Sequence, residues 1–300
     1  MTIQQLIAKR LRLFSRRKVL NMLDGNYDSV FKGKGVELES LRPYVPGDNV
    51  KDIDWRATAR TDEVHTRLYA PLRDQRIVVI ADTSPSMLLP SQSGTQKVES
   101  LYGLIVTLGM FVRKNRDQLA LCSTKPTGKI ALTRFSNTNN HIEGLLRSLD
   151  ESVHRTAPKN AKSLPELLQH TLHYLKHRSA IFIVTDGVAV ETNIKPLLTK
   201  LSARHQIFFL QIQPSTPLTG QLEEATEYFD IESLTPFIGQ LTLDKKLAGE
   251  WTTMIAAWQI SFKQMCRSTG TAYGWVEDPT STPRVLQGMF NEAKRYAKRH

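Results

Sequence analysis

The distribution of apolar residues divides the chain at about residue 76. Beyond that point, short apolar runs bounded by turn signals alternate with longer segments whose apolar residues recur at helical spacing. The expected strands are 77–81, 118–123, 180–185, 206–212 and 271–276, and the expected helices are 97–115, 139–150, 164–177, 193–203, 248–268 and 283–298. Strands separated by helices of this length predict an α/β fold, a doubly wound parallel sheet covered on both faces by helices.

The first quarter of the chain has a different pattern of apolar and polar residues. Residues 1–24 have the pattern of a basic amphipathic helix, and residues 25–75 mix glycine turns with short alternating stretches. We therefore expect a β-rich N-terminal addition to one α/β domain at 76–300. Within that domain, residues 214–247 interrupt the alternation of strands and helices, which predicts an insertion that carries a hairpin or a lid.

The charge is strongly positive and lies mostly at the two ends. The 300 residues include 40 basic and 29 acidic side chains, a formal net charge of +11, and residues 9–18 hold six positive charges and no negative one. Such ends form either solvated helix faces or surfaces for nucleic acid, an anionic membrane or an acidic partner.

The sequence also bears on the compartment. The longest apolar run, 104–112, is too short to span a bilayer, and we find no signal peptide pattern. The two cysteines, Cys122 and Cys266, form no metal-binding spacing. We expect a cytoplasmic protein with both thiols buried.

Two strand ends carry the candidate chemistry. The stretch "IVVIADTSPSM" places Asp82, Ser84 and Ser86 at every second position after a strand, and "AIFIVTDG" places Asp186 after another. Alternate residues of an extended loop project to the same side, and ligands of parallel sheets bind beyond the carboxyl ends of the strands. Carboxylate and hydroxyl oxygens are ligands for Mg²⁺, Mn²⁺ or Ca²⁺. One string of this kind also suits a loop that caps backbone amides, but the pair of strand ends favours a magnesium site.

These motifs resemble those of a known fold and a known family. The order of strand, "DTSPSM", helix, strand and "VTDG" resembles the von Willebrand factor A fold and its metal-ion-dependent adhesion site, the MIDAS. The stretch "GKGVELESLRPYVPGDNVKDIDWRATAR" is similar to the signature of the bacterial family called domain of unknown function 58, although that family usually has an aromatic residue at Leu38 and a basic one at Asp52. The matching positions are Gly33, Gly35, Glu37, Arg42, Tyr44, Gly47, Asp48, Ile53, Asp54, Trp55 and Arg60.

The resemblance implies a ligand set and a partner class. Asp82, Ser84 and Ser86, helped by Asp186, would hold the metal and leave one position open for a carboxylate of a partner. A-type domains take a further ligand from a threonine in a G-T-x-L loop, and here only Thr156 or Ser163 of "RTAPKNAKSLPELL" can substitute for it. The implied partners are MoxR-type AAA+ ATPases, which are thought to act with such proteins in assembling or remodelling other complexes.

The N-terminal signature admits two interpretations. Trp55 is flanked by charged residues and would either anchor the added segment to the α/β domain or form a partner-binding surface with Arg42 and Arg60. Aromatic and arginine side chains are common anchors of protein interfaces.

No set of residues typical of an enzyme emerges. The sequence lacks a G-x-S-x-G elbow and glycine-rich phosphate loops. We expect a non-enzymatic, metal-dependent protein-binding module. The alternatives are metal-independent binding of nucleic acid or anionic membrane through the basic ends, and a metal-dependent phosphohydrolase that uses the same oxygens.

Overall fold

A computed structural model describes most of the chain from residue 38 onward. The described residues are 38–46, 48, 50, 53–61, 63–69, 75–90, 94–187, 194–213, 228–229, 236–237, 245–278 and 281–297. The helix predicted for residues 1–24 and most of the insertion predicted at 214–247 lie outside them. Within the insertion, β8 (Tyr228–Phe229) pairs antiparallel with β9 (Pro236–Phe237), as a hairpin would.

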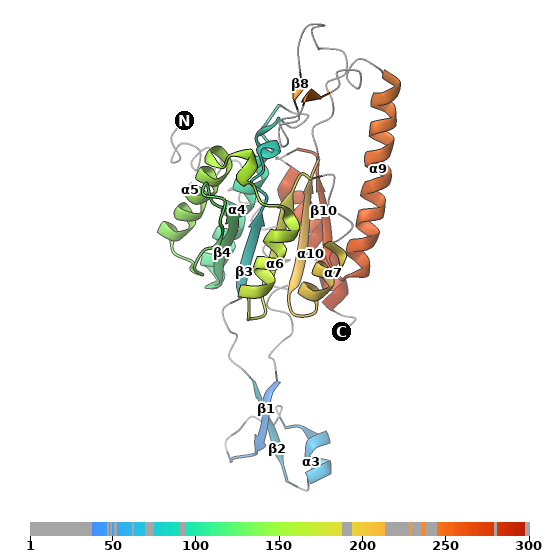
Figure 1. The fold of residues 1–300 in the computed structure, drawn as a ribbon. Helices are drawn as coiled ribbons and strands as arrows, with labels where there is room; N and C mark the ends of the chain where they lie inside the picture. The colour runs from blue at the N-terminus through green and yellow to red at the C-terminus, as the bar shows by residue number, and fades with distance from the viewer. Residues whose placement is uncertain are drawn as a thin grey trace.

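A six-stranded sheet forms the centre of the fold (Figure 1). The strands lie in the order β10 (Ala272–Val276), β7 (Gln206–Ile212), β6 (Ala180–Thr185), β3 (Arg76–Ala81), β4 (Gln118–Thr124) and β5 (Ile130–Leu132). All neighbours are parallel except β4 and β5. The fold is therefore mixed α/β with a mostly parallel sheet, and the five strands predicted from the sequence are confirmed.

The expectation of a fully parallel sheet is wrong at its β5 edge. A tight turn joins β4 to β5, in which Gly128 has a φ of +78° and its N–H donates to the carbonyl of Lys125. Such a short connection can join only antiparallel strands, because a parallel neighbour needs a long crossover.

Helices cover both faces of the sheet and create two hydrophobic cores. One face carries α4 (Val98–Asn115), α5 (Asn139–Arg155) and α10 (Thr282–Ala297), and the other carries α6 (Leu164–Tyr174), α7 (Ile194–Ser202) and α9 (Lys245–Ser268). Successive residues of β3 alternate between them, since Ile77 and Val79 enter the first core and Val78 and Ile80 the second. Burial on both faces explains why the central strands read as unbroken apolar runs.

The predictions about the thiols and the membrane can be compared with this fold. Cys122 and Cys266 are both free and buried, as expected. In the part of the chain that the structure describes, no helix has the length and apolar character needed to cross a membrane.

The N-terminal addition contains a helix as well as strands. β1 (Leu38–Pro43) pairs antiparallel with β2 (His65–Tyr69), and α3 (Trp55–Thr61) lies between them in the chain. The sequence pattern did not predict α3, which begins where Asp54 Oδ1 accepts hydrogen bonds from the N–H groups of Arg56 and Ala57. Figure 1 shows this small unit beyond the edge at which the strands of the main sheet begin.

Candidate functional site at the carboxyl ends of β3 and β6

Strand pairing brings the two predicted acidic residues together. β3 and β6 are parallel neighbours in which Ala81 lies opposite Val184. The pairing continues one residue further, because the N–H of Asp82 donates to the carbonyl of Val184 at 2.9 Å. Asp82 and Asp186 therefore leave adjacent strands at the same edge of the sheet.

Asp82 is held in place through both carboxylate oxygens. Its Oδ1 accepts a hydrogen bond of 2.9 Å from the N–H of Ser84, and its Oδ2 accepts one of 2.6 Å from Thr185 Oγ1. The Thr185 hydroxyl in turn accepts a hydrogen bond of 3.0 Å from the N–H of Gly187. Both loops thus fix the orientation of this carboxylate.

The two serines continue this arrangement toward Asp186. Ser84 Oγ lies 3.0 Å from Ser86 Oγ, and Ser86 Oγ donates to Asp186 Oδ1 at 2.9 Å. Ser86 belongs to a short 3-10 helix, η3 (Pro85–Leu88), and Ser84 precedes it in extended conformation. We call Asp82, Ser84, Ser86, Thr185 and Asp186 the strand-end cluster.

The strand-end cluster has an open side and a buried side. Asp82, Ser84 and Ser86 are half-buried, whereas Thr185 and Asp186 are buried. A ligand from solvent would therefore reach the cluster from the serine side.

Lys97 closes the buried side. Its ammonium Nζ lies 2.6 Å from Asp186 Oδ2, and the residue is only 1% exposed. The backbone brings it there, because Lys97 N–H donates to the carbonyl of Leu89 just after η3, and α4 begins at the next residue. The two oxygens of Asp186 thus have different partners, the ammonium on Oδ2 and the Ser86 hydroxyl on Oδ1.

The electrostatics of the strand-end cluster disfavour a charged Asp82. Burial of the carboxylate, followed by the nearby charge of Asp186, raises the pKa of Asp82 to about 6. The hydrogen bonds from Thr185 and Ser84 act in the opposite direction on this pKa. A cation bound next to Asp82 would relieve the repulsion between the two carboxylates.

Thr156 and Ser163, the two candidates for the further metal ligand, have different surroundings in the structure. Thr156 lies near the carboxyl ends of the strands, because the last turn of α5 approaches the end of β4, where Ser152 Oγ lies 3.4 Å from Ser123 Oγ. Ser163 starts α6, which returns the chain to the beginning of β6 and so begins at the same edge. Thr156 follows α5, is 7% exposed, and its buried hydroxyl has no hydrogen-bond partner among the described residues. Ser163 is instead engaged at the start of α6, where its N–H and its hydroxyl both donate to Glu166 Oε2. The orphaned hydroxyl favours Thr156 over Ser163.

Sequence reasoning missed one member of the strand-end cluster, Thr185, and two residues that support the cluster, Lys97 and Gln211. Thr185 and Lys97 contact its carboxylates, and the buried Gln211 on β7 donates from Nε2 to the carbonyl of Gly187 at 2.9 Å. Thr185 stands beside Asp186 in "VTDG", so its place in that motif was a usable signal. Lys97 and Gln211 gave none, because a charged or polar residue carries no mark of burial in a single sequence.

The oxygens of the strand-end cluster fit a hard divalent cation. The spacings of 3.0 Å between the serine hydroxyls and 2.9 Å from Ser86 to Asp186 match the edge of an octahedron, about 2.9–3.0 Å for Mg²⁺–oxygen distances of about 2.0–2.1 Å. The buried hydroxyl of Thr156, for which the described part of the chain supplies no partner, is the kind of group that a cation satisfies. The donors are carboxylate and hydroxyl oxygens, which suit hard cations better than zinc. Within the described ranges, no group of three or more His, Cys, Asp or Glu side chains is placed to hold a metal ion.

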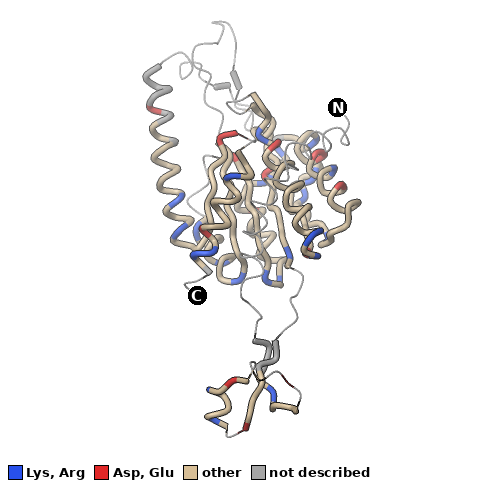
Figure 2. The backbone as a smooth tube through the Cα atoms, turned by 180° about the vertical axis from the view of Figure 1, so that it is seen from behind, with Lys and Arg blue, Asp and Glu red and all other residues tan. Residues whose placement is uncertain are grey.

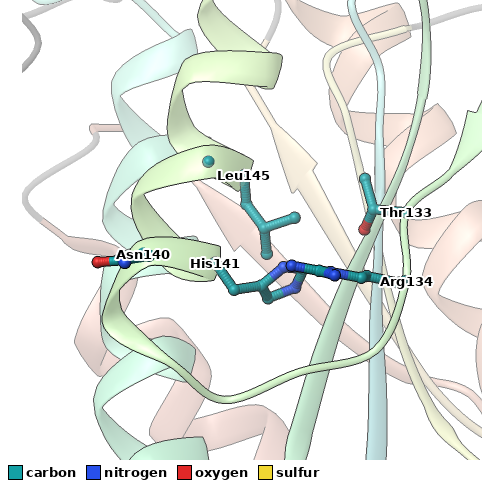
Figure 3. A pocket seen from close by; sticks show the side chains of 6 residues that line it. Thr133, Arg134, Asn140, His141 and Leu145 are labelled. Carbon is teal, nitrogen blue, oxygen red and sulfur yellow. The ribbon is translucent and has the colours of Figure 1, made fainter.

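A separate pocket lies between the segment that follows β5 and the first half of α5 (Figure 3). It has a volume of about 290 Å³ and is lined by Thr133, Arg134, Asn140, His141, Gly144 and Leu145. The His141 ring is fixed by a contact of 2.9 Å between Nε2 and the carbonyl of Leu119, at the start of β4. The strand-end cluster is therefore not part of this pocket.

The predicted N-terminal surface is exposed. Trp55 is 65% exposed at the start of α3, which does not agree with the interpretation of this side chain as an anchor to the α/β domain. Arg42 is paired with Asp48, whose Oδ1 lies 2.7 Å from Arg42 Nη2 and whose pKa that bond lowers. Arg60 Nε donates to the carbonyl of Arg56 within α3.

Comparison with known proteins assigns the chain to a family. Residues 40–219 match the family described as "Protein of unknown function DUF58". The chain belongs to this family. Uncharacterized proteins of Mycobacterium bovis and Mycobacterium tuberculosis are 21% identical to it over 264 residues, which cover 87% of this chain and 81% of theirs.

Two solved structures are similar to this DUF58 protein at low identity. An aerotolerance-related membrane protein from Bacteroides fragilis is 14% identical, with a TM-score of 0.45 over 72% of this chain and 98% of that one. The conserved hypothetical protein BatB from Bacteroides thetaiotaomicron is 16% identical, with a TM-score of 0.45 over 75% and 99% of the two chains.

The region shared with the DUF58 family includes both candidate surfaces. It begins in β1 and ends after β7, so it contains α3 with Trp55 and the whole strand-end cluster. Helices α9 and α10 lie outside it.

Proposed function

We propose that this DUF58 protein is a non-enzymatic protein-binding module with a von Willebrand factor A-like fold and a MIDAS-like magnesium site at the strand-end cluster. The observation that carries the proposal is the chain of hydrogen bonds that connects Asp82, Ser84, Ser86 and Asp186, from loops that are a hundred residues apart. The cluster is open to solvent on its serine side, where a partner can approach.

The residues have separate roles in this proposal. The hydroxyls of Ser84 and Ser86 and the carboxylates of Asp82 and Asp186 would hold Mg²⁺, with Thr156 as the further oxygen donor. Bound there, the ion supplies a coordination position for a carboxylate of the partner protein. Thr185 keeps Asp82 in one orientation, so the donors need little rearrangement on binding.

A binding role is favoured over a catalytic one by the composition of the site. Among the described residues, the hydrogen bonds of the strand-end cluster involve Asp, Ser, Thr and Lys side chains and backbone groups, with no imidazole or thiol. The cluster thus lacks the imidazole that most often serves as a general base.

We further propose MoxR-type AAA+ ATPases as the partner class, because the resemblance to A-type domains implies it. The exposed Trp55 and Arg60 on α3 offer a second surface for the same assembly, distant in the fold from the strand-end cluster. Such an assembly would act on a client complex.

The test is capture from native lysate on the immobilised full-length protein, with magnesium and with EDTA. We expect magnesium-dependent retention of a MoxR-type ATPase, lost in Asp82→Ala and kept in Ser163→Ala. The second variant is a matched control, since it removes a serine hydroxyl at the same edge that is engaged with Glu166. Retention of the same proteins by all variants, in EDTA as in magnesium, would contradict the proposal.

A second candidate function uses the opposite edge of the sheet. Figure 2 shows Lys and Arg gathered along the edge where the strands begin. Basic residues at this edge include Arg76, Arg116, Arg178 and Arg204. This distribution supports binding of nucleic acid or anionic lipid, which would weaken steeply with added salt and survive EDTA. A salt titration of binding to single-stranded DNA and to anionic vesicles tests it.

A further inference from the structure

The side chain of Lys97 places a positive charge beside the strand-end cluster. The side chain is almost completely buried, and its ammonium forms an ion pair of 2.6 Å with Asp186 on the side of the strand-end cluster that faces away from solvent. Burying a lysine and an aspartate together costs solvation that their attraction seldom exceeds, so such a pair is weak evidence for a purely stabilising role.

Lys97 contacts one of the proposed metal ligands but cannot be a ligand itself. An ammonium has three donors and no acceptor, so Lys97 cannot coordinate a cation. It instead occupies Asp186 Oδ2 and leaves Oδ1 facing Ser86. Any divalent ion held by Ser86 and Asp186 Oδ1 would therefore lie one carboxylate away from a fixed positive charge.

We propose that Lys97 neutralises Asp186, keeps the strand-end cluster assembled without a divalent ion, and lowers the affinity of the cluster for such an ion. This inference rests on the proposed metal site and adds how tightly that site holds its ion. The site binds divalent cations weakly and reversibly, because the positive charge of Lys97 repels them across Asp186. Its loops keep their arrangement when the ion leaves.

Two other roles of Lys97 make different predictions. If Lys97 serves only to orient Asp186 for the metal, its removal weakens metal binding, as loss of an outer-shell partner usually does. If it serves only to stabilise the fold, its removal leaves the affinity of the folded protein unchanged. Only a repelling charge gives tighter binding when the lysine is replaced.

The experiment measures Mn²⁺ binding to the purified full-length protein by electron paramagnetic resonance, with no partner present. The variants are Lys97→Met, which removes the charge, and Lys97→Arg, which keeps it. We expect Lys97→Met to bind Mn²⁺ about tenfold or more tightly than the wild type, and Lys97→Arg to bind within about threefold of it. Equal or weaker binding by Lys97→Met, or no detectable binding by any of the proteins, would overturn the inference.

Thermal unfolding gives a second readout. Lys97→Met leaves Asp186 without its ion-pair partner, so we expect this variant to unfold at a lower temperature than the wild type in EDTA. Mg²⁺ should raise the unfolding temperature of the variant toward the wild-type value. Its effect on the wild type should be much smaller. If Mg²⁺ stabilises the wild type more than the variant, the charge of Lys97 does not oppose the ion.

A second variant decides the matter if Lys97→Met does not fold. Lys97→Gln removes the charge and keeps a side-chain donor for Asp186 Oδ2. We expect it to bind Mn²⁺ about tenfold or more tightly than the wild type, as for Lys97→Met. Equal or weaker binding would overturn the inference. These assays need no partner, so failure of protein capture with the expected order of Mn²⁺ affinities refutes the proposed function alone.

Discussion

Thr185 and Asp82, 103 positions apart in the chain, are joined by a hydrogen bond of 2.6 Å across the ends of two paired parallel strands. The Thr185 hydroxyl donates to Asp82 and accepts from the N–H of Gly187, so one buried side chain ties together the two acid-bearing loops. This relationship makes Thr185 a positioning residue for the strand-end cluster.

Replacing Thr185 by valine tests that role. The change leaves Asp82 Oδ2 and the Gly187 N–H without their partner, and an unsatisfied buried polar group costs about 1–3 kcal/mol. Because both residues are only half-buried, we expect Thr185→Val to lower the free energy of unfolding by about 2 kcal/mol in total, measured by urea denaturation. Thr185→Ser keeps the hydroxyl and is the control, with an expected loss below about 1.5 kcal/mol. Equal losses in the two variants would show that the hydroxyl is not what matters.

The raised pKa of Asp82 predicts a pH dependence of stability in EDTA. Its folded pKa of about 6 lies above the ordinary value of 3.8, so the contribution of Asp82 is most favourable below pH 3.8 and is lost as the pH rises through 6. Two pKa units correspond to about 3 kcal/mol, and partial exposure of Asp82 to solvent reduces this to about 1–2 kcal/mol.

Asp82→Asn should remove that dependence. We expect the variant to be about 1–2 kcal/mol more stable than the wild type at pH 8 in EDTA, and the difference to shrink between pH 6 and pH 4. Urea denaturation at several pH values measures both effects. A variant that is less stable than the wild type at pH 8 would argue that neither burial nor the charge of Asp186 disfavours the charged form of Asp82.

The orphaned hydroxyl of Thr156 gives a third prediction. Thr156→Val removes a buried hydroxyl that has no partner among the described residues, so stability in EDTA should stay equal or increase, while Mn²⁺ affinity falls by about tenfold or more. Ser163→Ala should do the reverse, since it removes a helix cap worth about 1 kcal/mol and leaves Mn²⁺ affinity unchanged. Mn²⁺ titration and urea denaturation of both variants distinguish the two residues, and a loss of affinity in Ser163→Ala alone would reverse the assignment.

Gly274 marks a close approach between β10 and α10. A Cβ at this position would lie 2.5 Å from both Met289 Sδ and Val285 Cγ1, so we expect Gly274→Ala to lower stability by about 1–3 kcal/mol. Gly288 on α10 has nothing within 4 Å of such a Cβ, and Gly288→Ala should raise stability by about 0.5–1 kcal/mol through helix propensity. Thermal unfolding of the pair checks both signs, and an equal effect in the two would exclude packing as the cause.

The sequence predicted those parts of the fold that have a long and regular pattern. The five parallel strands and six long helices agree with it to within a few residues, because burial on two faces leaves continuous apolar strands and each helix carries an apolar stripe. β5 was missed because it spans three half-buried residues, too few to show a period. α3 was missed because its seven residues include none that is buried, so no apolar face signals a helix.

The sequence predicted those residues of the candidate site that follow a recognisable strand. Asp82, Ser84, Ser86 and Asp186 follow visible strands, and the pairing of β3 with β6 brings them together. Lys97 was not predicted, since its partner is 89 positions away and a lysine before a helix ordinarily lies in solvent. Long-range pairing of this kind becomes visible only once the sheet is assembled.

The sheet order also dictates when the site can exist during synthesis. Asp82 and Lys97 are made early, but their partners Thr185 and Asp186 lie at the end of β6 and just after it, and β6 can pair with β3 only after three α-helices and two other strands have been made. Closing so long a loop is slow compared with forming local helices. A nascent chain that stops short of β6 therefore has the serines without the carboxylate that Ser86 contacts, and the proposed metal site would form only in molecules in which β6 has paired with β3.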